Sequence, residues 1–494
     1  MRCYHHVLSL ALLAICAGAA LVGAGEPGIP INVGHQKQLF IDNRFLQKAS
    51  GVEVVVNAPR PTGEKLLQSA GPWEKHAVGG YTSVVEEDGR IHMWYETLDL
   101  KERAGVAYAF SVDGGATWTR PVLNVIEYDG SKDNNLVILD VTGTHVFLNR
   151  SDAPPDQKYV MICGAPNRAY VSPEGVHWTQ FGSEPFLDLS EAAKLPKKVR
   201  GTGLDSQNVM FWDTRLNKYV CYPRVNFYLP DGWRPGNFLR TFCRLESDTL
   251  GGFSGLRMAI EPDAKDPPES DFYTSAAVQY PYAADAYFMF PAIYFHSPKR
   301  PKVGSDGPLD IRFAASRDGI IWQRPERRPI IRLGLEGSDS GGSLYAGYGL
   351  TRKGDEVSLY YTAYDVTHAG YLDRGYLGGT ITRAIYRLDG FMSVDSTVKG
   401  GQFTTPSIVF DGSRLELNVD ASAAGEVRVE MLNEQGQPIP GFALADCEPL
   451  VQSGVAKRVL WKGSDDLASL RSKPVKLRFA MRDAKLYAFQ FVNP

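Results

Sequence analysis

The segment Ser111-Val-Asp-Gly-Gly-Ala-Thr-Trp118 combines a turn acid, glycines and an aromatic residue, and related segments recur along the chain. The other copies are Ser172-Pro-Glu-Gly-Val-His-Trp178, Glu246-Ser-Asp248 running on to Phe253, Ser316-Arg-Asp-Gly-Ile-Ile-Trp322 and Leu388-Asp-Gly-Phe391. Their acids, at positions 113, 174, 248, 318 and 389, are 61, 74, 70 and 71 residues apart. A near-constant period is typical of an array of similar sheets. Five copies predict a five-bladed β-propeller.

The motif has a structural explanation. An aspartate in a tight turn accepts hydrogen bonds from backbone N–H groups two or three residues later, and glycine adopts the left-handed conformation. The aromatic residue is expected to pack between adjacent sheets. We therefore expect the motif to fasten the sheets at their periphery, away from any catalytic centre.

Composition narrows the class of protein. Of 494 residues, 44% are hydrophobic, and 53 basic residues nearly balance 56 acidic ones, so no basic surface for nucleic acid or membrane lipid is indicated. The 49 glycines and 31 prolines, with few helical periodicities, favour an all-β, turn-rich fold.

The first residues predict export. Arg2 precedes an apolar run from Val7 to Val22, and small residues at Val22-Gly-Ala24 provide a cleavage point. Residues 1–24 are therefore interpreted as a signal peptide of a secreted or periplasmic protein, without a membrane span. The sequence Leu13-Ala-Ile-Cys16 is a poor lipobox, because a small residue is expected before the cysteine.

Four cysteines remain after this segment: Cys163, Cys221, Cys243 and Cys447. They are far apart and lack histidine neighbours, so a zinc site is not expected. A Cys221–Cys243 disulfide and free buried thiols are both compatible with the sequence. We predict no cofactor and no catalytic metal, and leave a structural calcium ion open.

The strand pattern divides the chain into two domains. Residues 25–399 are assigned to the propeller, within which residues 25–75 supply strands that close the ring, at Gln38–Asp42 and Val52–Asn57. Residues 400–494 contain alternating strands at the spacing of a β-sandwich. This second domain either binds sugar or braces the propeller.

The starts of the inner strands of a propeller converge on its axis, as a binding site requires. Three of the predicted openings carry carboxylates, Asp205, Asp271 and Asp339, and these are the predicted catalytic residues. Clustered carboxylates without a metal site fit glycosidic bond cleavage, in which one acid protonates the leaving oxygen and another activates water or attacks carbon. The alternative is that aspartate is simply common at strand starts.

Further polar and aromatic residues are expected to bind substrate. They are Trp73, Tyr81, His145, Asn208, Tyr273, Arg312, Glu336 and His368. The aromatic rings would stack on sugar faces, and the arginine would pair with a carboxylate or an acidic sugar. The competing interpretations are core packing for the aromatic residues, a solvated strand face for the arginine and a structural role for the histidine.

On blade count, export and the axial acids, residues 35–395 resemble the five-bladed propeller glycoside hydrolases of families 43 and 32, and the following sandwich resembles the invertase branch. Two positions depart from that pattern. Tyr81-Thr-Ser83 stands where invertases have Asn-Asp-Pro-Asn, and Asn149 stands at a second-blade position where these families carry aspartate. The turns also resemble the Asp-boxes of sialidases, which have six blades.

The sequence thus predicts an exported glycoside hydrolase that acts on a polysaccharide or oligosaccharide by carboxylate acid/base catalysis. A non-catalytic carbohydrate-binding propeller is the alternative from another class. A phosphorolytic enzyme on the same scaffold would need a phosphate pocket of arginines and histidine.

Overall fold

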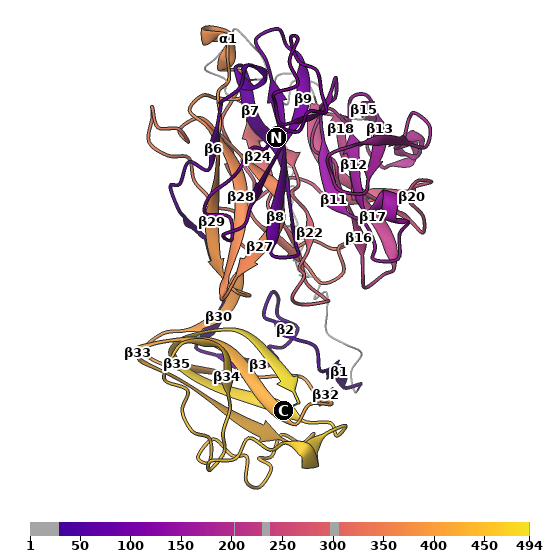
Figure 1. Ribbon diagram of the computed structural model, residues 1–494. Coiled ribbons are helices and arrows are strands. Elements are labelled where there is room, and N and C mark those ends of the chain that lie inside the picture. Colours follow the sequence, from indigo (N-terminus) through magenta and orange to yellow (C-terminus); the bar gives the residue numbers. More distant parts are fainter. Residues whose placement is uncertain (1–28, 202, 230–237, 297–305, 494) are drawn as a thin grey trace, which may run out of the picture.

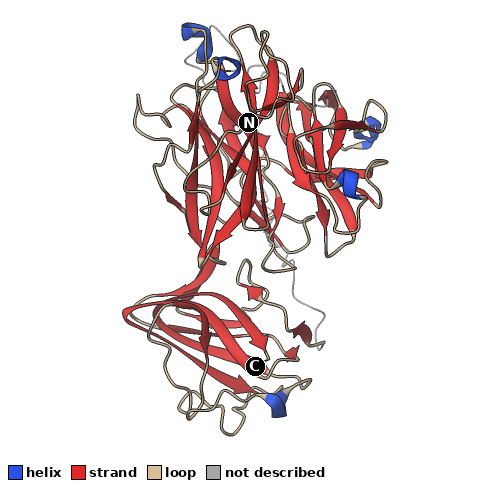
Figure 2. Ribbon diagram, in the orientation of Figure 1, coloured by secondary structure: helices blue, strands red, loops and turns tan. Residues whose placement is uncertain are grey.

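The computed structural model describes residues 29–201, 203–229, 238–296 and 306–493, and this part of the chain is almost entirely β-stranded (Figure 2). Its one α-helix is the single turn α1 (Tyr371–Arg374). The predicted signal peptide lies outside the described residues. Among the helices described, none has the length and apolar character needed to cross a bilayer.

Successive antiparallel groups of strands, here called meanders, fill the upper part of Figure 1. The first meander contains β7 (Ala77–Glu87), β8 (Arg90–Leu98), β9 (Ala104–Ser111) and β10 (Leu136–Leu139). The second contains β11 (His145–Leu148), β12 (Tyr159–Cys163), β13 (Arg168–Ser172) and β14 (Thr179–Phe181). Alternating apolar residues make each group amphipathic or fully buried, as packed sheets require.

The third meander contains β15 (Val199–Gly201), β16 (Val209–Asp213), β17 (Lys218–Tyr222), β18 (Arg224–Tyr228), β19 (Phe238–Ser247) and β20 (Ser254–Ile260). The fourth contains β21 (Ser270–Thr274), β22 (Val278–Gln279), β23 (Tyr287–Met289), β24 (Ala292–Phe295), β25 (Leu309–Ile311) and β26 (Ala314–Ser316). The fifth contains β27 (Ser343–Lys353), β28 (Glu356–Tyr364) and β29 (Thr380–Arg387). β7 of the first meander meets β27 of the fifth at Ser83 and Tyr348, and Ala77 also bridges to Gly378, just before β29.

The turn motifs fasten one meander to the next. Asp113 accepts hydrogen bonds of 3.0 Å from the backbone N–H groups of Ala116 and Thr117. Trp118, at the end of the same motif, packs edge-on against Tyr360 of β28, with ring centroids 5.7 Å apart. Local hydrogen bonds hold the pKa of the Asp113 carboxyl far below its usual range. The expected structural role of this motif is therefore confirmed.

Two other copies repeat the arrangement between different meanders. Trp94 of β8 donates a 2.7 Å hydrogen bond to the carbonyl of Gly175. The corresponding donor in the third meander is the hydroxyl of Tyr222, which lies 2.6 Å from the carbonyl of Gly319. In each case the glycine has a positive φ, 81° and 69°, so its carbonyl turns toward the neighbouring aromatic residue.

Replacing Gly175 with Ala will destabilise the protein more than the same change at an open turn. A Cβ at Gly175 would lie 2.4 Å from the Trp94 ring, whereas a Cβ at Gly89, whose φ is also positive at 74°, meets nothing within 4 Å. Both variants carry the left-handed strain of about 1–2 kcal/mol, and G175A adds roughly 1–3 kcal/mol of overpacking. Urea unfolding measures the free energy of unfolding of both variants. Equal losses of stability would contradict the close approach of Gly175 to the Trp94 ring.

The N-terminal strands do not all lie where the sequence suggested. β2 (Gln38–Leu39), β3 (Lys48–Ser50) and β4 (Val52–Val56) pair with strands of the C-terminal sheet. Only the short strands β5 (Arg60–Pro61) and β6 (Leu67–Gln68) pair with β29 at the outside of the fifth meander. The interpretation of residues 25–75 as ring-closing strands is thus wrong for residues 38–56. Strand periodicity shows that a segment needs a partner but does not identify the partner.

The C-terminal unit occupies the lower part of Figure 1. Its large sheet contains the long strands β33 (Arg414–Leu432) and β35 (Lys476–Val492), with β30 (Met392–Ser396), β31 (Gly401–Thr404) and β34 (Gly454–Arg458). β1 (Ile31–Gly34) pairs in parallel with β32 (Ile408–Phe410). Because β30 pairs with β35, the sheet begins before the predicted boundary at residue 400. One apolar cluster, including Phe40, Phe403 and Phe489, fills this unit.

The last turn motif, Leu388–Phe391, joins the meanders to the C-terminal unit. Buried Asp389 accepts a 2.9 Å hydrogen bond from the Tyr280 hydroxyl and pairs with Lys37 at 2.9 Å. The amide of Asn418, on β33, donates to the same carboxylate at 3.1 Å. These contacts tie the fourth and fifth meanders to the C-terminal unit. The four cysteines, Cys163, Cys221, Cys243 and Cys447, are buried free thiols.

Candidate functional site

A pocket of about 450 Å³ opens between the first, fourth and fifth meanders. We call it the axial pocket. Its walls carry five tyrosines, two histidines and two glutamates: Tyr81, Tyr273, Tyr345, Tyr364, Tyr371, His76, His368, Glu96 and Glu102. The volume and the mixture of aromatic and polar groups are typical of a small-molecule site.

Two glycines make room for this pocket. Gly79 and Gly80 lie in β7 with φ of 83° and 82°, and the pairing of β7 with β8 shifts register between Val78 and Thr82. A Cβ on Gly79 would lie 2.3 Å from the Thr362 side chain. The resulting bulge allows β7 to pass close to β28, and such bulges often re-aim side chains beside functional sites.

Glu96 is the carboxyl group of the pocket whose proton affinity is most clearly altered. It lies on β8, half-buried, and accepts a 2.7 Å hydrogen bond from the backbone N–H of Thr144 and one of 3.2 Å from the Thr142 hydroxyl. Burial raises the pKa of Glu96 to about 7, although these hydrogen bonds oppose the shift. A carboxyl with this pKa can hold a proton near neutral pH and donate it, as a general acid must.

Tyr273 and His368 form the opposite wall. The Tyr273 hydroxyl lies 2.9 Å from Nε2 of His368, and their ring centroids are 5.1 Å apart. Burial, with Arg240 and Arg224 nearby, lowers the pKa of His368 to about 4. The imidazole is therefore neutral at physiological pH. The structure thus brings Tyr81, Tyr273 and His368 together, as the sequence predicted.

Asp205 lies beside the tyrosines and is exposed. It forms an ion pair with Arg224, which is 2% exposed. The Arg224 guanidinium lies over the Tyr273 ring, with Cζ 4.8 Å from the centroid, and the Tyr81 hydroxyl donates a 3.3 Å hydrogen bond to the Asp205 carbonyl. Asp205 precedes β16 in a loop instead of opening the strand.

Asp271 lies within β21 and is fully buried. It pairs with Arg240 at 2.7 Å and with Nε2 of His296 at 2.8 Å, and its second oxygen accepts the backbone N–H of Arg240. A carboxylate held on both oxygens is poorly suited to transfer protons or attack substrate. The catalytic role of Asp271 therefore stays a prediction, while its described contacts are those of a buried ion pair.

Asp339 and Glu336 do not line the pocket. Both are exposed in the segment before β27, and Asp339 pairs with Lys65 of the N-terminal segment. Their predicted position assumed that the inner strand began at residue 339, whereas β27 begins at Ser343. Since the chain is irregular there, the carboxylate of Asp339 points to solvent and not to the axis.

Four predicted substrate-binding residues have structural contacts instead. Trp73 packs in the apolar cluster of the first meander, with its ring 5.8 Å from that of Tyr128. The Nε2 atom of His145 lies 2.6 Å from the Met210 carbonyl, and burial lowers the pKa of this imidazole to about 3. Asn208 accepts the backbone N–H of Arg224 at 3.0 Å. Arg312 pairs with Asp310 at 3.1 Å.

Tyr348 of β27 packs in the interior of the fold. Its ring lies 4.3 Å from that of His145 and packs against apolar clusters formed by the second to fifth meanders. The surroundings of Tyr348 are therefore a packed core.

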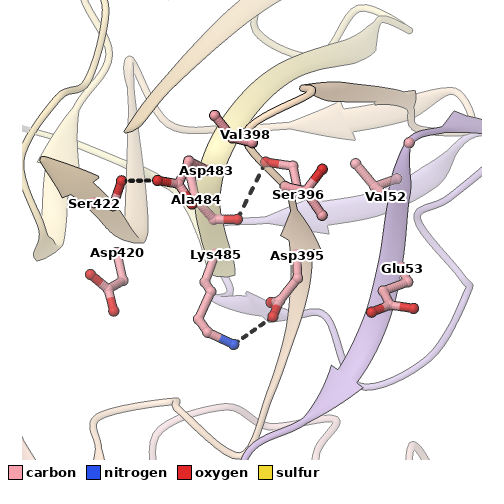
Figure 3. Close-up of a pocket in the computed structure, with 12 residues that line it drawn as sticks. Val52, Glu53, Asp395, Ser396, Val398, Asp420, Ser422, Asp483, Ala484 and Lys485 are labelled. Atoms are coloured by element: carbon pink, nitrogen blue, oxygen red, sulfur yellow. Dashed lines mark hydrogen bonds and ion pairs between the residues drawn. The ribbon is translucent and has the colours of Figure 1, made fainter. Parts of the chain in front are cut away.

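A larger hollow of about 740 Å³ lies in the C-terminal unit and contains four carboxylates, of Glu53, Asp395, Asp420 and Asp483 (Figure 3). Lys485 points toward Asp395 and pairs with it at 2.5 Å, while Ser422 donates a hydrogen bond to Asp483. No aromatic side chain belongs to its described lining. Because this hollow offers no aromatic surface and the Asp395 carboxylate is already paired, the axial pocket is the stronger candidate.

Sequence reasoning missed Glu96. Glu96 shares its face of β8 with Arg90, His92, Trp94 and Leu98, and this face is less buried than the opposite one. A glutamate on a strand face that mixes charged and apolar residues carries no distinctive signal in the sequence.

Comparison with known proteins gives structural likeness at low identity. No family model matches the chain, and no curated protein matches it significantly. A thermostable family-43 glycoside hydrolase is 14% identical with a TM-score of 0.42, over 65% of this chain and 95% of that one. The catalytic domain of a GH62 α-L-arabinofuranosidase from Coprinopsis cinerea is 13% identical with a TM-score of 0.39, over 69% and 97%. An N-acetylgalactosamine deacetylase from F. plautii, in complex with blood group B trisaccharide, is 14% identical with a TM-score of 0.42, over 69% and 97%.

Proposed function

We propose that the protein is an exported glycoside hydrolase that cleaves a poly- or oligosaccharide in the axial pocket. The observation that supports this most directly is Glu96, a half-buried carboxyl with a pKa of about 7 in a pocket walled by tyrosines. The five meanders are interpreted as the blades of a five-bladed propeller. The C-terminal unit is interpreted as a β-sandwich that includes strands from residues 31–56.

Glu96 is proposed as the general acid that protonates the leaving oxygen. Asp205 is the second carboxylate, paired with Arg224 and able to activate water or stabilise positive charge at the sugar carbon. Burial raises the pKa of the Tyr81 hydroxyl well above its usual range; the charge of Arg224 opposes this shift and that of Glu96 adds to it. Tyr81 also lines the axial pocket, where its hydroxyl can hold a sugar hydroxyl.

A non-catalytic carbohydrate-binding protein is the second candidate. It is favoured by the structural roles of Asp271 and Asp339, because only one of the three predicted catalytic acids remains beside the pocket. Both candidates bind a carbohydrate, but only the glycoside hydrolase cleaves it.

We expect the purified protein to release reducing sugar from at least one polysaccharide of a broad panel, with Glu96→Gln as the blank. The blank matters because it removes the proton donor without changing the shape of the pocket. Binding without release of reducing sugar by the unmodified protein would favour the binding protein instead.

A further inference from the structure

A second hollow, here called the junction hollow, lies between the meanders and the C-terminal unit and has a volume of about 660 Å³. Trp212 comes from β16, Tyr282 from the β22–β23 connection and Tyr348 from β27. Gln36 follows β1, and Gln490 lies on β35 of the C-terminal unit. The junction hollow shares no described lining residue with the axial pocket.

Aromatic faces dominate the walls of the junction hollow. Trp212, Tyr282 and Tyr348 are each half-buried and line the hollow. Guanidinium groups hold two of these rings in place: Arg150 lies 5.4 Å from the Trp212 ring centroid, and Arg352 lies 5.2 Å from that of Tyr282. Rigid aromatic rings offer an apolar face beside polar edges. Sugar rings present the complementary combination of C–H faces and hydroxyl edges.

The polar groups of the junction hollow are mostly amides. Gln279 accepts hydrogen bonds of 3.1 Å from the backbone N–H and hydroxyl of Thr214, which orients its amide. The Gln490 amide donates at 2.9 Å to the His35 carbonyl. Fixed amides of this kind can donate to and accept from hydroxyl groups.

The charges of the junction hollow are engaged within the protein. Lys37 pairs with buried Asp389 at 2.9 Å, and Arg352 donates a 2.7 Å hydrogen bond to the Gly354 carbonyl. The described lining contains no carboxylate. The chemistry therefore suits a neutral ligand better than a cation or an anion.

We propose that the junction hollow binds a short neutral oligosaccharide, independently of the axial pocket. Its volume lies within the range of about 300–1,000 Å³ that is usual for small-ligand sites. The site requires both the meanders and the C-terminal unit, and it does not depend on any catalytic activity.

The test is a glycan array probed with the full chain carrying Glu96→Gln, followed by calorimetric titration of the best-bound neutral glycan. Trp212→Ala and Tyr282→Ala, each added separately, should weaken binding at least tenfold. Tyr228→Ala is the matched control, since Tyr228 is 46% exposed on β18 outside the junction hollow. It should leave affinity unchanged, and circular dichroism confirms that each variant is folded.

The outcomes separate this proposal from the proposed function. Loss of binding in both aromatic variants supports the junction hollow, whether or not the unmodified protein hydrolyses any glycan. Absence of neutral glycan binding, preference for acidic glycans, or full affinity in both folded variants overturns it. Hydrolysis of a small chromogenic glycoside by Trp212→Ala at the rate of the unmodified protein would confirm that the two sites act separately.

Discussion

Replacing Glu96 with Gln will lower kcat/KM for glycoside hydrolysis by roughly 10²–10⁴-fold, the usual contribution of a general acid. The glutamine amide keeps the shape of the side chain and can still accept a hydrogen bond from the Thr144 backbone N–H, but it has no acidic proton to transfer. In the unmodified protein the acid must be protonated, and its pKa is raised to about 7. Activity should therefore fall as the pH rises through about 7, and this alkaline decline should disappear in the variant.

Rates measured from pH 5 to 9 on the glycan identified by the panel provide the check. Glu336→Gln is the control, because Glu336 is an exposed glutamate outside the pocket. Asp205→Asn should lower the rate while keeping the alkaline decline, since Glu96 is intact. An E96Q enzyme with the original rate and pH profile would remove Glu96 from the chemistry.

Replacing Asp271 with Asn is expected to destabilise the fold by about 3–5 kcal/mol, the cost of breaking a buried ion pair from one side. The change leaves Arg240, whose side chain is 12% exposed, without its charged partner, and it weakens the contact with His296. Denaturant unfolding followed by tryptophan fluorescence measures the loss.

Asp339→Asn serves as the comparison. Asp339 is an exposed partner of Lys65, with side-chain exposures of 48% and 54%, and such surface pairs contribute about 0–1 kcal/mol. If D271N were as stable as D339N, the assignment of Asp271 to the structural framework would be wrong.

The sequence predicted local structure well where a motif is stabilised by hydrogen bonds within itself. The acid of Ser111–Trp118 binds backbone N–H groups three and four residues away, and that requirement depends on nothing distant. Strands at residues 38–56 were also recognised, but their partners belong to the C-terminal sheet.

The site was harder to predict because it depends on where strands begin. A difference of four residues places Asp339 in an exposed loop and not on β27. The surroundings of each acid also matter. Asp271 and Glu96 are both acids on strands, but Asp271 is paired with an arginine, whereas the hydrogen bonds of Glu96 come from threonines. Composition and spacing contain no information about that difference. Tyr81 and Tyr273 were predicted at strand openings; both line the pocket from within β7 and β21.

The interleaving of the two chain ends has a consequence for biosynthesis. Asn57 is hydrogen-bonded to Ser393, 336 positions away, and to Lys485, 428 positions away. At the roughly 5–20 residues per second of translation, β4 leaves the ribosome about 20 seconds or more before its neighbours in the sheet exist. During that interval its valine-rich edge is unpaired and open to wrong partners. The C-terminal sheet can assemble only after elongation is nearly complete, so a chaperone that shields residues 52–56 should raise the yield of native protein.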